Sequence, residues 1–295
     1  MDIKSIGILS PGDMGSAIGK ILSDSSFDVI TCLEGRSELT QIRAQEAGIR
    51  SVPSLDELTS EADIILSVLV PSRATALAEL TADSVSRTGT RPVYVDLNAI
   101  APQTVKSIND VMTNAGITFI DAGIIGSPPK TGQSRTRIYC SGENTSTFES
   151  IAKSGLDIRR IGPNIGQASG LKMIYAASTK GITALWTELL TASKALGLNE
   201  ALMDEYKTNG TDISSVLERR IPSMPRRSRR WVGEMEEIAK TFEGVGLTPK
   251  MLLGAADIYR LIGKTSLGDQ TSREPDPSTE VILKVITERL KSDSN

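Results

Sequence analysis

The sequence of 295 residues contains no histidine. This absence excludes a Ser-His-Asp triad and a zinc site with histidine ligands. If the protein is an enzyme, its acid or base must be a lysine, aspartate, glutamate, tyrosine or cysteine. We expect no metal site. Aromatic residues make up only 4% of the chain, which argues against a cleft that stacks sugars or single-stranded nucleic acid.

Cysteine and long apolar runs are scarce as well. The two cysteines, Cys32 and Cys140, both lie in segments with a strand pattern, so we predict buried thiols rather than a disulfide framework. No apolar run reaches the roughly 18 residues of a membrane span, and the N-terminal residues lack the apolar core of a signal peptide. The net charge of -3 gives no electrostatic reason for binding nucleic acid or an anionic membrane. We expect a cytoplasmic protein with neither partner.

The first half of the chain alternates β-rich runs with helical patterns. Strands are predicted at 3–9, 27–33, 64–70, 92–97 and 117–122, with a helix at about 12–22. Ser54 and Glu57 form a capping box that opens a short helix. This alternation predicts an α/β fold, a Rossmann-type doubly wound parallel sheet with helices on both faces.

After about residue 165 the pattern becomes helical. A long helix is predicted from Gly170 to Leu196, and further helices at 200–208, 211–219, 228–243, 248–263 and 277–291. Thr248 is a candidate N-cap in front of Pro249. We therefore expect a Rossmann domain over residues 1–165 and an all-helical C-terminal domain over residues 166–295.

The segment SPGDMG at 10–15 has the spacing of a dinucleotide-binding loop. Gly12 and Gly15 match the second and third glycines of G-x-G-x-x-G, and the following helix offers free N–H groups to phosphate. Ser10 replaces the first glycine, which a serine can do if its φ is negative, and Pro11 has no N–H to give. The alternative is an ordinary strand-turn-helix connection. The position between the first strand and the first helix favours the cofactor loop, formed by Ser10, Pro11, Gly12, Asp13, Met14 and Gly15.

Glu34, Arg36 and Ser37 follow the second predicted strand. An acidic residue here binds the ribose 2′-hydroxyl of NAD, whereas an arginine accommodates the 2′-phosphate of NADP. Arg36 with Ser37 favours NADP, with NAD as the alternative. We also assign Val70, at the end of the strand predicted at 64–70, to the cofactor site.

Four segments in order resemble the β-hydroxyacid dehydrogenase superfamily, which includes 6-phosphogluconate and 3-hydroxyisobutyrate dehydrogenases. They are SPGDMG at 10–15, YVDLNAIAP at 94–102, FIDAGIIGSPP at 119–129 and GQASGLKMIYAASTKG at 166–181. The helical half looks most like the phosphogluconate-dehydrogenase-like branch. The resemblance implies hydride transfer between a nicotinamide and a small hydroxylated, anionic substrate, and a homodimer formed through the helical domain.

The resemblance implies that Lys172 is the general acid/base. The residues themselves are compatible with this role, because desolvation in the small, apolar stretch GQASGLKMIYAA would lower the lysine pKa. The alternative is a lysine whose stem covers apolar surface while its head reaches water. Asn98 is the candidate for a polar contact beside the nicotinamide. Tyr175 completes the candidate catalytic set.

The sequence departs from the family at two positions. Ala176 stands where the family has an asparagine, so Tyr175 could supply a hydroxyl instead. Ile125 stands where a serine usually grips the substrate carboxylate. Lys180, two turns beyond Lys172, either faces the cleft or is solvated, and Asp121 at a strand end is either functional or a turn former. The candidate substrate-binding residues are Gly123, Ile125, Gly126, Lys172, Tyr175 and Lys180.

Six arginines lie within residues 219–230. Either they pair with nearby acids such as Glu234, Glu236 and Glu237, or they bind a carboxylate or phosphate group. Two functional alternatives also stay open. One is reduction of a C=N bond, against which the retained Lys172 counts. The other is cofactor binding without turnover, which the altered positions Ser10, Ile125 and Ala176 would suit.

Overall fold

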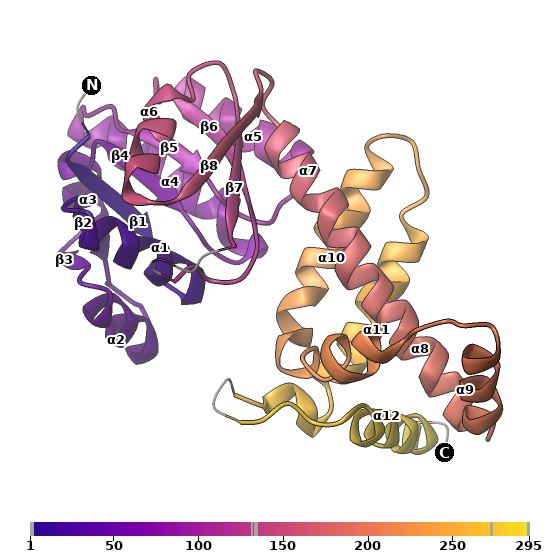
Figure 1. Ribbon diagram of the computed structural model, residues 1–295. Helices are drawn as coiled ribbons and strands as arrows, with labels where there is room; N and C mark the ends of the chain where they lie inside the picture. Colours follow the sequence, from indigo (N-terminus) through magenta and orange to yellow (C-terminus); the bar gives the residue numbers. More distant parts are fainter. Residues whose placement is uncertain (1–2, 131, 133–134, 272–273, 294–295) are drawn as a thin grey trace. The chain divides into compact units, whose positions relative to one another are not determined.

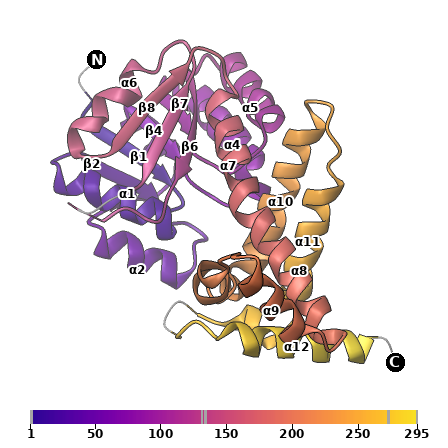
Figure 2. The ribbon, with the colours of Figure 1, turned by 45° about the vertical axis from the view of Figure 1, so that its right-hand side comes forward.

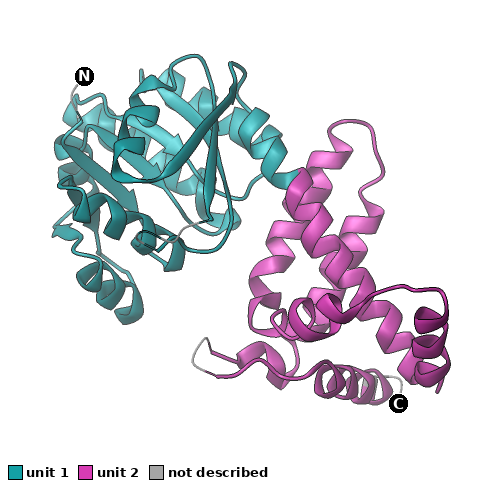
Figure 3. Ribbon diagram, viewed as in Figure 1, with its two compact units in different colours: residues 1–173 teal, residues 174–295 magenta. Residues whose placement is uncertain are grey.

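The structure is a computed structural model that describes residues 3–130, 132, 135–271 and 274–293. The chain forms two compact units, residues 1–173 and 174–295 (Figure 3). The division falls inside helix α7 (Gln167–Ala176), which begins in the first unit and ends in the second. Within the described residues, no helix combines the length and the apolar character that crossing a membrane requires.

The first unit contains one sheet of eight strands in the order β3-β2-β1-β4-β5-β6-β7-β8 (Figure 1). Neighbouring strands are parallel except for the antiparallel pair β6 and β7. The strand order reverses between β1 and β4, and doubly wound sheets bind their ligands at such a point. The predicted α/β Rossmann-type class is confirmed. The strands are β1 (Ser5–Leu9), β2 (Asp28–Cys32), β3 (Arg50–Val52), β4 (Ile64–Ser67), β5 (Val93–Asp96), β6 (Phe119–Ile125), β7 (Arg137–Ser141) and β8 (Asp157–Gly162).

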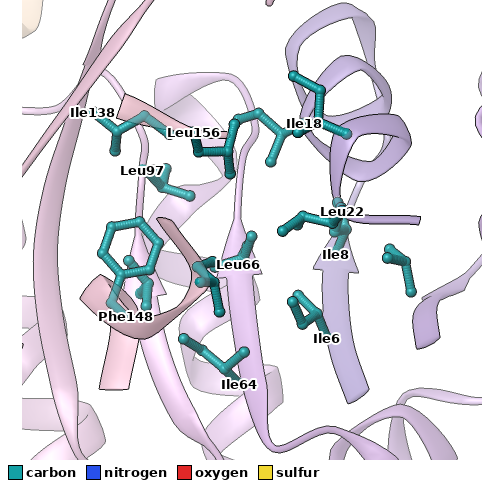
Figure 4. Packing of buried hydrophobic residues seen from close by; sticks show 14 of the residues in the cluster. Ile6, Ile8, Ile18, Leu22, Ile64, Leu66, Leu97, Ile138, Phe148 and Leu156 are labelled. Carbon is teal, nitrogen blue, oxygen red and sulfur yellow. The ribbon is translucent and has the colours of Figure 1, made fainter. Parts of the chain in front are cut away.

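Helices cover both faces of this sheet because its strands are apolar on both sides. In β4, Ile64 and Leu66 pack into one core cluster and Ile65 into the other. The first cluster includes Ile18 and Leu22 of α1 and Phe148 of α6 (Figure 4), and the second includes residues of α3, α4 and α5. The helices of this unit are α1 (Asp13–Asp24), α2 (Glu38–Glu46), α3 (Leu55–Glu61), η1 (Pro71–Arg73), α4 (Ala74–Thr88), α5 (Pro102–Asn114), α6 (Ser146–Glu149) and η2 (Ser150–Ser154).

Several sequence predictions for this unit need correction at their boundaries. β6 begins and ends later than predicted, so it includes Gly123 and Ile125. β3 and β8 were not predicted, because β3 has three residues and β8 carries Arg159 and Arg160 within a short run. The predicted cap of α3 is confirmed, since the Ser54 hydroxyl accepts the N–H of Glu57 at 3.2 Å.

The second unit is helical throughout its described elements. After α7 they are η3 (Ala177–Gly181), α8 (Ile182–Ala195), α9 (Asn199–Thr208), η4 (Val216–Arg220), η5 (Pro225–Arg227), α10 (Ser228–Glu243), α11 (Lys250–Gly263), η6 (Ser266–Asp269) and α12 (Thr279–Asp293). The helices α10 and α11 lie side by side and α8 packs against α11 (Figures 1 and 2). The rings of Trp231 and Tyr259 join α10 to α11 edge to face, with centroids 5.2 Å apart.

The long helix predicted from Gly170 to Leu196 is interrupted by η3, a π-helical turn. At this turn the Tyr259 hydroxyl of α11 donates to the carbonyl of Lys180 at 2.6 Å. The helix predicted at 211–219 is also wrong in part, because its ordered turn is the π-helical segment η4. The range predicted for α10 is confirmed. α11 begins one residue after Pro249, and the Thr248 hydroxyl accepts the N–H of Lys250 at 3.4 Å.

Candidate cofactor and substrate site

The turn after β1 takes an unusual backbone conformation. Ser10 has φ +66°, in the left-handed region that favours glycine. The expectation of a negative φ at this serine is therefore wrong. The N–H of Gly12 donates to the carbonyl of Ser10 at 2.7 Å and closes a tight turn around Pro11. The loop thus keeps the glycine-like turn of the motif although a serine occupies it.

Gly12 is the N-cap of α1, and it has no side chain that could accept a hydrogen bond from the first N–H groups of the helix. A Cβ added at Gly12 would meet no protein atom within 4 Å. The start of α1 therefore has open space at Gly12 and no side-chain cap among the described residues. Free N–H groups and a positive helix end suit a phosphate. Met14 packs against the first core cluster, which leaves its backbone rather than its side chain for a ligand.

The loop after β2 holds the three residues predicted to select the cofactor. Arg36 is half-buried, whereas Glu34 is exposed. The Ser37 hydroxyl caps α2 by accepting the N–H of Thr40 at 3.3 Å. Arg43 of α2 forms an ion pair with Asp13 in the first turn of α1. Arg43 thus adds a positive charge beside the glycine loop.

A cavity of about 430 Å³ lies against α2 and the first residue of the loop after β2. Leu33, Glu38, Gln41, Ile42, Gln45, Ile49 and Ser51 line it. It contains none of the residues predicted for the site. We therefore do not assign the cofactor to it, because the glycine loop offers the free N–H groups that a phosphate needs.

Val70 and Asn98 follow β4 and β5, whose ends meet at the same edge of the sheet as the glycine loop. Val70 is 46% exposed and starts the 3₁₀ turn η1. Asn98 is only 2% exposed, and its amide donates to Ser67 and Asp96, at 2.9 Å each, while its oxygen accepts the N–H of Leu69 at 2.6 Å. Both amide hydrogens are thus used within the protein, and the contact of Asn98 with the nicotinamide stays a prediction.

A row of buried polar residues crosses four neighbouring strands near this edge. Ser67 pairs in register with Asp96, Asp96 with Asp121, and Asp121 with Ser141. All four are fully buried. Ser67, Asp96 and Ser141 were not among the site residues predicted from the sequence. The sequence offered one signal for these residues, namely that each is a polar residue at the end of an apolar strand.

Burial raises the pKa of Asp96 to about 7, against the hydrogen bonds from Asn98. The nearby Asp121 raises the Asp96 pKa further. Burial also raises the pKa of Asp121, although hydrogen bonds from Ser169, Ser141 and Gly166 oppose this. Two adjacent buried carboxyls therefore resist being charged together.

Asp121 anchors the helix that carries Lys172. One carboxylate oxygen accepts the N–H groups of Gly166, Ala168 and Ser169 at 2.9, 3.0 and 3.2 Å, and the hydroxyls of Ser141 and Ser169 at 2.8 and 3.3 Å. The carboxylate thus caps the N-terminus of α7 from β6, where negative charge is favourable. Asp121 is a structural cap rather than a turn former.

Gly123 allows α7 to approach β6 closely. A Cβ at Gly123 would lie 2.9 Å from both the carbonyl oxygen of Ala168 and the Cβ of Lys172. The stem of Lys172 therefore starts beside the carboxyl end of β6, and its side chain is half-buried. Gly123, predicted to bind substrate, is required here by packing.

The remaining substrate candidates lie in different environments. Ile125 ends β6 and is buried at 4% exposure, and Gly126 has φ +137°. A Cβ at Gly126 would lie 2.8 Å from Thr136. Tyr175 is 45% exposed, one turn beyond Lys172 on α7. The structure thus brings Gly123, Ile125 and the stem of Lys172 to one end of β6.

Lys180 does not have the position expected of a cleft residue. Its ammonium forms an ion pair with Glu234 of α10 inside the helical unit, and both side chains are about one-tenth exposed. It also lies 5.7 Å from the centroid of the Trp231 ring. Helical spacing predicted that Lys180 faces the same side as Lys172. Its partner Glu234 lies 54 residues later in the chain, so spacing could not predict this ion pair.

The described residues include no group of three or more cysteine, aspartate or glutamate side chains that could hold a metal ion. The candidate site therefore consists of the glycine loop, the loop after β2, the end of β6 and Lys172 on α7. Apart from the loop after β2, these positions belong to three of the four segments on which the resemblance rests, those at 10–15, 119–129 and 166–181.

Comparison with known proteins agrees with this geometry. The family described as the NAD binding domain of 6-phosphogluconate dehydrogenase matches residues 5–154. A domain of unknown function (DUF1932) matches residues 194–262. An uncharacterized 28.5 kDa protein of Methanothermus fervidus is 28% identical over 258 residues, which are 87% of this chain and 98% of that protein.

Two solved structures resemble the chain along most of its length. The structure of a conserved protein of unknown function, itself similar to 3-hydroxyacid dehydrogenases, has a TM-score of 0.66 at 29% identity and covers 88% of this chain and 96% of that one. The 3-hydroxyisobutyrate dehydrogenase of Mycobacterium tuberculosis with L-serine has a TM-score of 0.69 at 15% identity, with 96% and 99% covered. This second likeness shows the fold alone.

The family match spans half of the chain and includes the glycine loop, the loop after β2 and all of β6. The resemblance inferred from the four sequence segments is confirmed. The chain belongs to the 6-phosphogluconate dehydrogenase NAD-binding domain family, within the 3-hydroxyacid dehydrogenase-like superfamily, and carries a C-terminal DUF1932 region.

Proposed function

We propose that the protein is an NADP-dependent oxidoreductase that acts on a small hydroxylated, anionic substrate or its carbonyl form. The observation that supports this most is the docking of α7 on β6. Asp121 caps the N-terminus of α7, and Gly123 leaves room for α7 to pack closely on β6. The side chain of Lys172 therefore starts at the same sheet edge as the glycine loop. A lysine at this edge suits proton transfer next to a cofactor bound at the strand ends.

The residues of the first unit fit a nicotinamide dinucleotide. The open space at Gly12 and the uncapped start of α1 would receive the pyrophosphate. Arg36, with the hydroxyl of Ser37, would hold a 2′-phosphate, since an arginine fork suits phosphate oxygens. When bound, the nicotinamide supplies the hydride chemistry. Lys172 would take the hydroxyl proton during oxidation and return it to the carbonyl oxygen during reduction.

The cofactor preference is tested by measuring the Kd of NADPH and NADH for the wild type and for Arg36→Ala. We expect tighter binding of NADPH, and a loss of at least about tenfold in NADPH affinity in the variant, because a charged hydrogen bond contributes about 1.5–3 kcal/mol. NADH affinity should change little. Equal binding of both cofactors by the wild type would remove the preference.

The reaction is tested with a panel of hydroxyacids and ketoacids in the presence of NADP or NADPH. Lys172→Met should lower turnover by about 10²–10⁴-fold while the Kd of NADPH stays within about twofold, because a positioned acid/base contributes about that much. Near-normal turnover in this variant would remove Lys172 from the mechanism. Tight NADPH binding without turnover across the panel would favour cofactor binding alone.

An imine reductase is the second candidate, because solved imine reductases share this fold, for example one from Bacillus cereus with a TM-score of 0.57 at 16% identity. Adding cyclic imines to the same panel separates the two reactions. Turnover of imines but not of ketoacids would favour C=N reduction over the proposed dehydrogenase.

We also infer that the helical unit forms a homodimer. The connection between α10 and α11 exposes Val245 and Leu247, and the start of α11 exposes Met251, at 73, 56 and 78%. Three large apolar side chains within seven residues of one hairpin tip are typical of a surface that another molecule covers. The family resemblance favours a second copy of the chain as the molecule that covers this surface.

A further inference from the structure

The arginines at 219–230 lie in the helical unit, and the proposed function uses none of them. Three are paired with carboxylates. Arg226 contacts Asp276 at 2.6 Å, Arg229 contacts Asp269 at 2.6 Å, and Arg230 contacts Glu234 at 3.3 Å. For these three the expectation of ordinary ion pairs holds. Arg219 and Arg220 are exposed on η4.

Arg227 differs from all of these. It is half-buried, and no carboxylate within ion-pair distance of it is found among the described residues. Its guanidinium carbon lies 6.0 Å from the centroid of the Trp231 ring, and it donates to the Ser223 hydroxyl at 3.5 Å, the limit of a hydrogen bond. A guanidinium has five N–H donors, so most of its donors have no acceptor among the described residues.

The surroundings of Arg227 are positively charged. Burial lowers the pKa of Arg227, and the charges of Arg226 and Arg230 lower it further, with only Asp276 acting in the opposite direction. Lys180 also reaches the Trp231 ring from η3, where Glu234 pairs with it. Arg226 and Arg230 each have a carboxylate partner, whereas none is found for Arg227 among the described residues. A positive charge without a counterion is unfavourable in a half-buried place.

The start of α10 adds to the same field. α10 has 16 residues and Arg227 is its N-cap, without a side-chain cap bond. The N–H of Ser228, the first residue of α10, already donates to the carbonyl of Pro225, so the contribution of this helix start is the positive end of its dipole. Arginine forks and helix N-termini are two groups that proteins use to hold phosphate.

We propose that Arg227, together with Arg230 and the start of α10, binds a doubly charged phosphate group, either free or carried by a small molecule. Glu234 pairs with Lys180 and Arg230, and the Trp231 ring lies next to the Arg227 guanidinium. This site goes beyond the proposed function and does not depend on it, because every group in it belongs to the helical unit.

Trp231 offers a local readout. The chain has two tryptophans, so a Trp186→Phe background leaves Trp231 as the single tryptophan, which is excited selectively at wavelengths that tyrosine does not absorb. Fluorescence is titrated with inorganic phosphate and, in a second arm, with glycerol 3-phosphate, at constant ionic strength set with sodium chloride. We expect a saturable change in Trp231 fluorescence with at least one of the two probes.

In this background Arg227→Gln should weaken phosphate binding at least about tenfold, since a hydrogen bond to a charged group contributes about 1.5–3 kcal/mol. Arg220→Gln is the matched control, with the same loss of charge at an exposed position, and should keep the affinity within about twofold. Arg227→Lys keeps the charge without the fork and should still lose several-fold. It serves as the test if Arg227→Gln does not fold, as judged by circular dichroism.

The outcomes separate clearly. Tighter binding of glycerol 3-phosphate than of phosphate would support a small-molecule phosphate ester, and the reverse would support free phosphate. A fluorescence change that chloride reproduces at equal ionic strength would overturn the proposal, as would the absence of a saturable change with both probes. Unchanged affinity in Arg227→Gln or in Arg227→Lys would do the same.

Discussion

At the scale of single residues, Ser10 is expected to affect the stability of the fold and Gly12 the binding of the cofactor. Ser10 carries a left-handed φ that costs a serine about 1–2 kcal/mol. Glycine relieves that cost but loses about 0.5–1 kcal/mol through the freedom of the unfolded chain. Ser10→Gly should therefore leave the free energy of unfolding unchanged or raise it by up to about 1 kcal/mol. Urea unfolding measures this, with NADPH affinity expected to stay within about twofold.

Gly12→Val should show the reverse behaviour. A Cβ at Gly12 meets no protein atom, so the variant should fold with nearly the same stability. Its side chain would occupy the space in front of the first N–H groups of α1, and NADPH binding measured by calorimetry should be lost. Strong NADPH binding by Gly12→Val, together with loss of binding in Ser10→Gly, would contradict the assignment of this loop.

Asp96 makes the stability depend on pH in a defined direction. Its pKa is about 7 in the folded chain, above the 3.8 of a free aspartate. The folded state therefore holds more protons between about pH 4 and 7, and the stability that Asp96 provides at low pH is lost as the pH rises through this window. One proton corresponds to at most about 1.4 kcal/mol per pH unit. Asp121 acts in the same direction.

Asp96→Asn should flatten the fall of the unfolding free energy between pH 5 and 7, measured with urea at several pH values. Asp157→Asn is the control. The Arg159 partner lowers the pKa of Asp157, so the stability that this ion pair provides is lost only as the pH falls below about 4. An unaltered slope in Asp96→Asn would mean that Asp96 is charged throughout this range.

At the scale of elements, the connection of β6 to α7 carries the candidate site. Asp121→Ala would leave the N–H groups of Gly166, Ala168 and Ser169 without their acceptor, at a cost of roughly 2–5 kcal/mol. Hydrogen exchange should then show loss of protection in the first turns of α7. Asp121→Asn should keep most of the protection, because one carboxylate oxygen has no partner in the described structure and an amide can turn its NH₂ group there.

Asp110→Ala is the matched control for this change, since Asp110 is an exposed aspartate on α5. It should leave the exchange of α7 unaltered. Equal protection of α7 in Asp121→Ala and in the wild type would show that the helix is held by packing at Gly123 rather than by the cap. Turnover is a separate readout and is informative only if the proposed role of Lys172 holds.

The same elements show what the sequence alone can predict. The glycine loop, the apolar strands β1, β2, β4 and β5 and the cap at Ser54 depend on neighbours within a few residues, and they were predicted. The network of Asn98 depends on the register that brings Ser67 and Asp96 together. The partner of Lys180 comes from another helix. Such pairs are set by tertiary packing. Spacing along the chain therefore indicates which side of a helix a residue faces, but not which residue of another element it contacts there.

At the scale of the whole molecule, the exposed tip between α10 and α11 tests the proposed homodimer. The wild type should elute as a dimer in size-exclusion chromatography with light scattering. The double variant Leu247→Glu with Met251→Glu should dissociate it, because placing two carboxylates in an apolar interface carries a large desolvation cost. Both variant residues are exposed in the single chain, so folding should be preserved.

Leu80→Glu provides the matched control, because Leu80 of α4 is 55% exposed in the first unit and should not affect assembly. A dimer that survives the double change would place the interface elsewhere in the chain. A wild type that is monomeric at micromolar concentration would remove the dimer altogether. In that case another molecule would have to cover the apolar tip. The phosphate titration at Trp231 would then report binding to a monomer.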